Sequence, residues 1–245
     1  MQIQMIGTGN AFAKKYFNNN ALVTAGGRRL LIDCGVTATY ALHLLSVPLT
    51  DLEGILVTHI HGDHIGGLEE VACRMKFVHR GKLKLFVPAE LEKPLWDNAL
   101  KGGLEDAGSG WVALSDYFDV TLLEANEPKT LFPGLTVTLI PTKHIPGKPS
   151  FGVLLNECVY YSSDTTFDPD LLMRLADGGK CRHILHDCQL HGQGVVHASL
   201  EELLTLPPRI QRMIWLMHYD DDREEFEGKT GEMRFIEQHA VYWFD

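Results

Sequence analysis

A short segment crowded with metal-binding residue types follows the apolar run at residues 55–57. Residues 59–64 read His-Ile-His-Gly-Asp-His, so three imidazoles and one carboxylate occupy six positions. Side chains alternate faces along an extended strand, and His59 and His61 therefore leave the backbone on the same side and can share one ion. The pattern predicts a metal site at the end of a strand.

The second half of this segment predicts a second ion. Gly62 permits a tight turn, after which the adjacent side chains of Asp63 and His64 diverge and reach a different point. Neutral imidazole and carboxylate suit zinc, with manganese, iron or cobalt as substitutes. A lone histidine beside a strand is more often a satisfied polar residue than a ligand. Four such residues in six positions instead favour two Zn²⁺ ions, or Mn²⁺ in their place.

The segment resembles the H-x-H-x-D-H signature of hydrolases of the metallo-β-lactamase fold, and the likeness extends along nearly the whole chain. In that family further polar residues follow strands, and here four more follow apolar runs: Asp33, His144, Asp164 and His218. The resemblance implies an α/β fold, a four-layer αββα sandwich with the metals at one edge of two sheets. It also implies two zinc sites, the first formed by His59, His61 and His144 and the second by Asp63, His64 and His218, with Asp164 bridging them.

Length and composition agree with this fold. The chain has 245 residues, 45% of them hydrophobic and 22% charged, which suits one large domain over residues 1–245. Strand and helix patterns are mixed along it, as in a layered α/β domain. Residues 1–6 read as a first strand rather than a signal sequence, and no apolar run reaches the length of a membrane span. Five cysteines without a C-x-x-C pair suit a reducing compartment, so we expect a cytoplasmic protein, in the host cytoplasm if a phage encodes it.

A second pair of elements resembles the ribonuclease Z branch of this fold. In that branch an acidic residue after a strand orients a histidine, and here Asp187 follows an apolar run while His197 precedes Ala198 and Ser199. The resemblance implies that Asp187 holds His197 as a general acid. An imidazole held by a carboxylate can protonate an alkoxide leaving group near neutral pH. The alternative is that His197 only lies near the start of a helix capped by Ser199.

Phosphodiester cleavage gives the metal-binding segment a matching role. Two metal ions about 3.5 to 4 Å apart can lower the pKa of a shared water and neutralise phosphoryl oxygens. Asp63 can orient that water as well as bind metal. We therefore count Asp63 among the predicted catalytic residues, with His197 and Asp187.

Two features argue against a large RNA substrate. Bacterial tRNA-processing members of that branch carry a long flexible arm, rich in glycine, proline and basic residues, between the third and fourth metal motifs. Here only residues 153–162 separate the pair at 151–152 from the pair at 163–164. The formal charge is −10, from 22 Lys and Arg against 32 Asp and Glu, whereas RNA affinity is supplied largely by cations. We expect a small substrate with one phosphate and no stable nucleic-acid partner.

A ribonuclease Z-like core of this size without the arm is similar to the anti-Pycsar phosphodiesterases of phages and their bacterial relatives. This resemblance implies metal-dependent hydrolysis of 3′,5′-cyclic mononucleotides, cyclic CMP and cyclic UMP among them, to 5′-monophosphates, which evades Pycsar-type antiviral signalling. It also implies a homodimer. The alternatives are a tRNA 3′-processing endonuclease, a protein that sequesters a nucleotide without chemistry, and a thioester or lactone hydrolase. The pair of Asp187 and His197 disfavours the last of these.

Two further segments allow more than one interpretation. The glycine-rich stretch 102–111 and the aromatics after it can form a lid whose ring stacks on a base, or these aromatics can return to the core. The acidic run 220–225 reads as a solvated turn. Its first residue, Asp220, is near enough in sequence to support His218 through a hydrogen bond.

Overall fold

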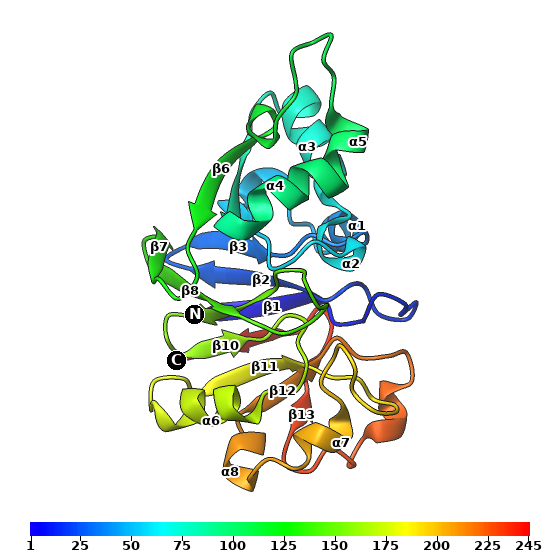
Figure 1. Ribbon diagram of the computed structural model, residues 1–245, viewed down its shortest axis with the longest axis vertical. Helices are drawn as coiled ribbons and strands as arrows, with labels where there is room; N and C mark the ends of the chain where they lie inside the picture. The colour runs from blue at the N-terminus through cyan, green and yellow to red at the C-terminus, as the bar shows by residue number, and fades with distance from the viewer.

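The computed structural model describes residues 1–245 and places two seven-stranded β-sheets face to face between outer layers of helices (Figure 1). The first sheet has the strand order β14-β1-β2-β3-β4-β5-β6, and the second has the order β13-β12-β11-β10-β9-β8-β7. The four-layer αββα sandwich predicted from the sequence is confirmed.

The first sheet is antiparallel from β14 to β3 and parallel from β3 to β6. Its strands are β1 (Gln2–Gly7), β2 (Asn20–Ala25), β3 (Arg28–Ile32), β4 (Gly54–Leu56), β5 (Leu83–Pro88), β6 (Phe118–Leu123) and β14 (Val241–Trp243). In the second sheet the strands from β7 to β10 alternate in direction, and those from β10 to β13 are parallel. Its strands are β7 (Lys129–Phe132), β8 (Leu135–Pro141), β9 (Phe151–Leu155), β10 (Val159–Tyr161), β11 (His183–Asp187), β12 (Ile214–Met217) and β13 (Arg234–Phe235).

The helices form the two outer layers. In Figure 1 the helices α1 to α5 lie with the first sheet in the upper half of the view, and α6 to α8 lie with the second sheet in the lower half. The helices are α1 (Ala38–Leu44), α2 (Gly62–Ile65), α3 (Leu68–Cys73), α4 (Glu92–Leu95), α5 (Lys101–Leu104), α6 (Pro169–Asp177), α7 (Leu200–Leu203) and α8 (Pro208–Gln211). Short 3₁₀ or π turns are η1 (Leu49–Asp51), η2 (Arg74–Val78), η3 (Ala89–Leu91), η4 (Trp96–Leu100), η5 (Leu114–Asp116) and η6 (Arg223–Phe226).

Two hydrophobic clusters hold these layers together, and strand periodicity divides the side chains between them. The larger cluster, of 51 buried residues, includes side chains of both sheets, and the smaller, of 16, lies where α6 to α8 cover the second sheet. In β10, Val159 and Tyr161 belong to the larger cluster while Tyr160 between them belongs to the smaller. This alternation is expected of a strand that is buried on both faces.

The sequence does not predict β6, β7, β13 and β14. The last two contain only two and three residues, which is too short for a periodic pattern. In β6 only Phe118 and Leu123 are buried, so its burial does not alternate either. Pairing with β5, β8, β12 and β1, rather than a pattern in their own residues, defines these strands.

The two ends of the chain meet in the first sheet. Strand β14 pairs with β1, and the Met1 amino group donates to the Phe244 carbonyl at 3.0 Å. Both ends lie at the left of Figure 1. No helix of the structure combines the length and the apolar character needed to cross a membrane.

Candidate metal centre

The predicted metal-binding residues come from both sheets and lie where strands end. In the first sheet Asp33 follows β3 directly, and His59 lies three residues beyond β4. In the second sheet β8, β10 and β12 run in the same direction, so their carboxyl ends reach one edge. At that edge His144 and Asp164 each lie three residues beyond a strand, and His218 directly follows β12.

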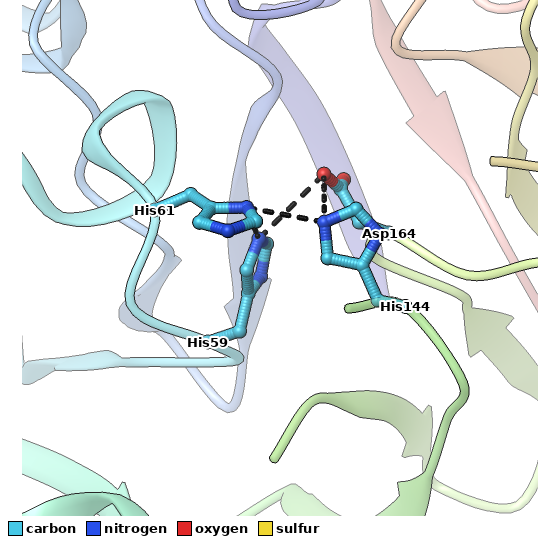
Figure 2. A group of neighbouring side chains, drawn as sticks. All are labelled: His59, His61, His144 and Asp164. Atoms are coloured by element: carbon cyan, nitrogen blue, oxygen red, sulfur yellow. Dashed lines mark hydrogen bonds and ion pairs between the residues drawn. The ribbon is translucent and has the colours of Figure 1, made fainter. Parts of the chain in front are cut away.

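One group of side chains comprises His59, His61, His144 and Asp164 (Figure 2). The Nδ1 atom of His61 lies 3.1 Å from Nε2 of His59 and 3.1 Å from Nε2 of His144. The Oδ2 atom of Asp164 lies 3.6 Å from each of these Nε2 atoms. The structure therefore brings together the four residues predicted for the first ion.

A second group comprises Asp63, His64, Asp164 and His218. Nε2 of His64 lies 3.2 Å from Oδ2 of Asp63 and 3.2 Å from Oδ1 of Asp164. Nε2 of His218 lies 3.3 Å from the same Asp63 oxygen. Asp164 thus turns one carboxylate oxygen toward each group, as a bridging residue must.

These residues fit a pair of divalent metal ions. Bonds of about 2.0 to 2.1 Å from one ion to tetrahedral nitrogen ligands place those nitrogens about 3.3 Å apart, close to the separations of 3.1 Å in the first group. In the second group Nε2 of His64 and Oδ1 of Asp164 are buried and have no hydrogen-bond partner. A bound ion would supply the partner that both atoms lack, and buried polar atoms of this kind otherwise carry an energetic penalty.

Burial and neighbouring charges set the protonation of both groups. Burial lowers the pKa of His59, of His61 and of His144, so these imidazoles are neutral and keep a lone pair for a metal. Burial works in the opposite direction on Asp164, but the surrounding histidines, His218 first, hold the pKa of its carboxyl well below the usual range. The bridging position therefore holds a carboxylate.

Several protein contacts fix which ring nitrogen faces each group. Nδ1 of His64 donates to Oδ2 of Asp33 at 2.8 Å, and Nδ1 of His144 donates to the Val196 carbonyl at 2.7 Å. Asp33 also accepts from the backbone N–H and the hydroxyl of Thr58, at 2.8 and 2.7 Å. These bonds leave Nε2 of both imidazoles facing the metal-binding groups, the usual arrangement around metal-binding histidines.

The backbone is left-handed at three positions of the centre. Asp33, Ser163 and His218 have φ values of 60°, 50° and 59°. A positive φ is uncommon for residues other than glycine and costs about 1 to 3 kcal/mol where the surroundings impose it. Sequence reasoning does not identify these turns, because no glycine marks them.

The chain turns at Gly62 as expected, but the turn does not require a glycine. Gly62 begins α2 with His61 as its N-cap, and an added Cβ there would meet nothing within 4 Å. The close approach occurs instead at Gly35, where a Cβ would lie 1.9 Å from the Asp63 carbonyl oxygen. Gly35 is the glycine that lets the segment after β3 pack against the metal-binding segment.

The predicted catalytic pair is also assembled. Nδ1 of His197 donates to Oδ2 of Asp187 at 3.0 Å, and Asp187 is fully buried at the end of β11. Burial alone would lower the pKa of His197, but the hydrogen bond and charge of Asp187, with Asp164, raise it above the ordinary value. The His197 ring lies 4.9 Å from the rings of both His144 and His218, so it adjoins both groups.

Both groups and His197 open into one cavity of about 600 Å³, a size that suits a small ligand. Its further lining includes Phe12, His191 and Asp220. The expected bond from Asp220 to His218 is wrong, because Asp220 accepts instead from Nδ2 of Asn10 at 2.5 Å.

The aromatics of the 102–118 region pack against their own half of the molecule. Tyr117 and Phe118 are buried in the larger cluster, and the Trp111 ring lies 5.4 Å from that of Phe77. Lys76 holds its Nζ 3.9 Å from the Trp111 ring centre, a cation–π contact. Of the two interpretations of this stretch, the structure has the aromatics returning to the core.

Comparison with known proteins identifies the family. The family described as anti-Pycsar protein Apyc1 matches residues 1–242. An anti-Pycsar protein Apyc1 from Paenibacillus xerothermodurans is 56% identical over 244 residues, covering 100% of this chain and 98% of the relative. A protein of the same description from Bacillus phage vB_BveM-Goe7 is 47% identical, covering 97% of this chain and 96% of the phage protein.

Solved structures agree on the fold. The metallo-β-lactamase fold protein YhfI from Bacillus subtilis has a TM-score of 0.75 at 18% identity, covering 100% of this chain and 99% of its own. The short form of human tRNase Z has a TM-score of 0.71 at 18% identity, with both chains covered completely. At these identities the likeness shows the metallo-β-lactamase fold alone, whereas the match over residues 1–242 is specific: the chain belongs to the anti-Pycsar protein Apyc1 family.

Proposed function

We propose that this chain is a metal-dependent phosphodiesterase that hydrolyses 3′,5′-cyclic mononucleotides, cyclic CMP and cyclic UMP among them, to 5′-monophosphates. The proposal depends on His197, which is held by the buried Asp187 and lines one cavity with two groups of metal-binding side chains. The description of its relatives as anti-Pycsar proteins supports a role in evading Pycsar-type antiviral signalling.

Two Zn²⁺ ions, or Mn²⁺ in their place, belong to this proposal. The first would be held by His59, His61 and His144, the second by Asp63, His64 and His218, with Asp164 between them. When bound, such ions supply Lewis acidity toward the phosphoryl oxygens and lower the pKa of water. Asp63, which lines the cavity, would orient the attacking water.

His197 acts on the leaving group. Its Nδ1 is occupied by Asp187, which leaves Nε2 as the nitrogen that can serve the cavity. As the bond from phosphorus to the 3′ oxygen breaks, Nε2 donates a proton to that oxygen, and the 5′-monophosphate results. Asp187 orients the ring and stabilises the imidazolium that gives up this proton.

A short connection beside the cavity supports a small substrate. Only residues 142–150 join β8 to β9, and His144 and Ile145 of this connection line the cavity. The cavity of about 600 Å³ accommodates a mononucleotide.

A product analysis tests the proposal. Metal-loaded protein is incubated with a panel of cyclic mono- and dinucleotides, with and without a chelator, and the products are separated by chromatography. We expect 5′-monophosphates from cyclic mononucleotides only when metal is present. Recovery of 3′-monophosphates or of intact nucleotides contradicts the proposal, and the latter favours sequestration. Cleavage of precursor tRNA at physiological salt in the same series favours the endonuclease.

The proposal includes a homodimer, by likeness to the anti-Pycsar family. Sedimentation velocity at several protein concentrations tests it, and a single species of 27.4 kDa contradicts it.

A further inference from the structure

The ring of Phe12 is an exposed aromatic group that borders the catalytic cavity. It is 83% exposed, and it lines both the cavity of about 600 Å³ and an adjoining one of about 460 Å³. Single exposed apolar side chains are common on protein surfaces. This ring differs because it lies between two cavities, one of which contains the candidate catalytic groups.

The backbone beneath this ring is held in place by Asn10. Oδ1 of Asn10 accepts from the backbone N–H groups of Phe12 and Ala13, both at 2.9 Å. Nδ2 of the same side chain donates to Asp220, which lies two residues beyond His218. Asn10 therefore ties the backbone of Phe12 to the segment that carries a candidate metal ligand.

The rest of this loop, which joins β1 to β2, is anchored to the same segment. The backbone N–H groups of Lys14 and Lys15 donate to the Asp221 carboxylate at 2.9 and 2.7 Å. The Tyr16 hydroxyl donates to Glu224 at 2.7 Å. At the start of the loop an added Cβ on Gly9 would lie 2.7 Å from the Ala13 Cβ, so the chain folds tightly back on itself. The loop is fixed on both sides of Phe12 while the ring itself stays free.

We infer that Phe12 is the stacking platform for the nucleobase of the substrate, an inference that rests on the proposed function. In a cyclic mononucleotide the ribose separates the phosphate from the base. With the phosphate at the two metal-binding groups, the base extends along the cavity. The rings of Phe12 and His191 border both cavities, but His191 is bound to Asp222 at 2.6 Å, whereas the exposed Phe12 ring is free to stack. Stacking covers the exposed ring, and the anchored loop lowers the entropic cost of binding.

This platform does not select one base. A phenyl ring offers a π face and no hydrogen-bonding edge, and every nucleobase has a π face. Phe12 therefore strengthens binding of pyrimidine and purine substrates alike. Any discrimination between bases arises from other groups.

Steady-state kinetics with a matched baseless substrate tests the role. We expect Phe12→Ala to raise KM for cyclic CMP and cyclic AMP about tenfold or more, with kcat within about twofold of wild type, because uniform binding is lost. The same change should leave hydrolysis of the 3′,5′-cyclic phosphate of 1-O-methylribose unaltered. Phe12→Tyr should restore KM. Trp243→Ala removes a 74% exposed ring that does not border these cavities and should change none of these values.

A binding measurement separates this inference from the proposed function. If wild type hydrolyses no cyclic nucleotide, the proposed function fails, and calorimetry with 5′-CMP and ribose 5-phosphate still tests the platform. Phe12→Ala should weaken the binding of 5′-CMP and leave the binding of ribose 5-phosphate unchanged. Equal losses for both ligands, or no loss, overturn the inference. A change in the sedimentation of Phe12→Ala would also overturn the inference, because such a change would assign the ring to a contact between subunits.

Discussion

Nδ1 of His197 lies 3.0 Å from Oδ2 of Asp187, and this bond leaves the opposite nitrogen of the imidazole free for the cavity. The carboxylate is fully buried and the imidazole is only partly buried. The pair therefore has one member fixed inside the protein and one that can meet a substrate.

His197→Ala should slow hydrolysis of cyclic CMP about 10²- to 10⁴-fold, the usual contribution of a general acid. The same variant should hydrolyse a bis-nitrophenyl phosphodiester at a rate much closer to that of wild type, because this leaving group needs no proton. Parallel rate measurements on the two substrates check this, with the exposed His79→Ala as a control. Equal losses on both substrates would remove the role assigned to His197.

Asp33→Asn should weaken metal binding about 10- to 100-fold, although Asp33 belongs to neither metal-binding group. An amide nitrogen opposite Nδ1 of His64 would turn the proton of that ring to Nε2, the nitrogen that faces the second group. Competition with a chromogenic chelator measures the change. Asp51→Asn, which alters an exposed ion pair with Arg29, is the control. Unchanged affinity in Asp33→Asn would show that this contact does not orient His64.

Gly35→Ala and Gly62→Ala should differ sharply. A Cβ at Gly35 would lie 1.9 Å from the Asp63 carbonyl oxygen, so the backbone of the metal-binding segment must move. We expect a loss of about 1 to 3 kcal/mol in stability together with a loss of bound metal. Gly62→Ala should retain both, since its Cβ meets nothing within 4 Å. Thermal unfolding and metal content per chain measure the two effects, and similar losses in both variants would contradict this account.

Glu224 should titrate at an unusually low pH. Hydrogen bonds from Lys15 and then Tyr16 lower the pKa of its carboxyl from 4.5 to about 2. Because the folded-state pKa is depressed, the stabilising contribution is complete above pH 4.5 and is lost as the pH falls toward 2. Carbon-detected NMR of the carboxyl group checks the midpoint. Tyr16→Phe should move it upward, and an ordinary midpoint in wild type would show that Glu224 does not anchor the loop.

The sequence predicts which residues lie together in the candidate metal centre, because these residues follow strands. Runs such as 55–57 are short and buried. The strand before His59 lies in the first sheet and the strand before His218 in the second, and both residues reach the same edge of the sandwich. The resemblance to a known signature then supplies the grouping that spacing alone leaves open. The two groups of side chains and the pair of Asp187 and His197 lie together as expected.

Features that depend on loop geometry are not predictable in this way. Nothing in the sequence marks Ser163 or His218 as left-handed, because neither is a glycine. Asp220 contacts Asn10, 210 positions earlier, rather than His218 two positions away. Phe12 likewise gains significance only from the cavity walls around it, which form when distant segments meet.

The first sheet and its connections contribute His59, His61, Asp63 and His64, while the second contributes His144, Asp164 and His218, so each of the two predicted metal-binding groups draws on both halves of the sandwich. Metal binding therefore depends on how the two halves of this single chain pack against each other. A mutation that weakens the packing between the two sheets should therefore lower the metal content of the protein.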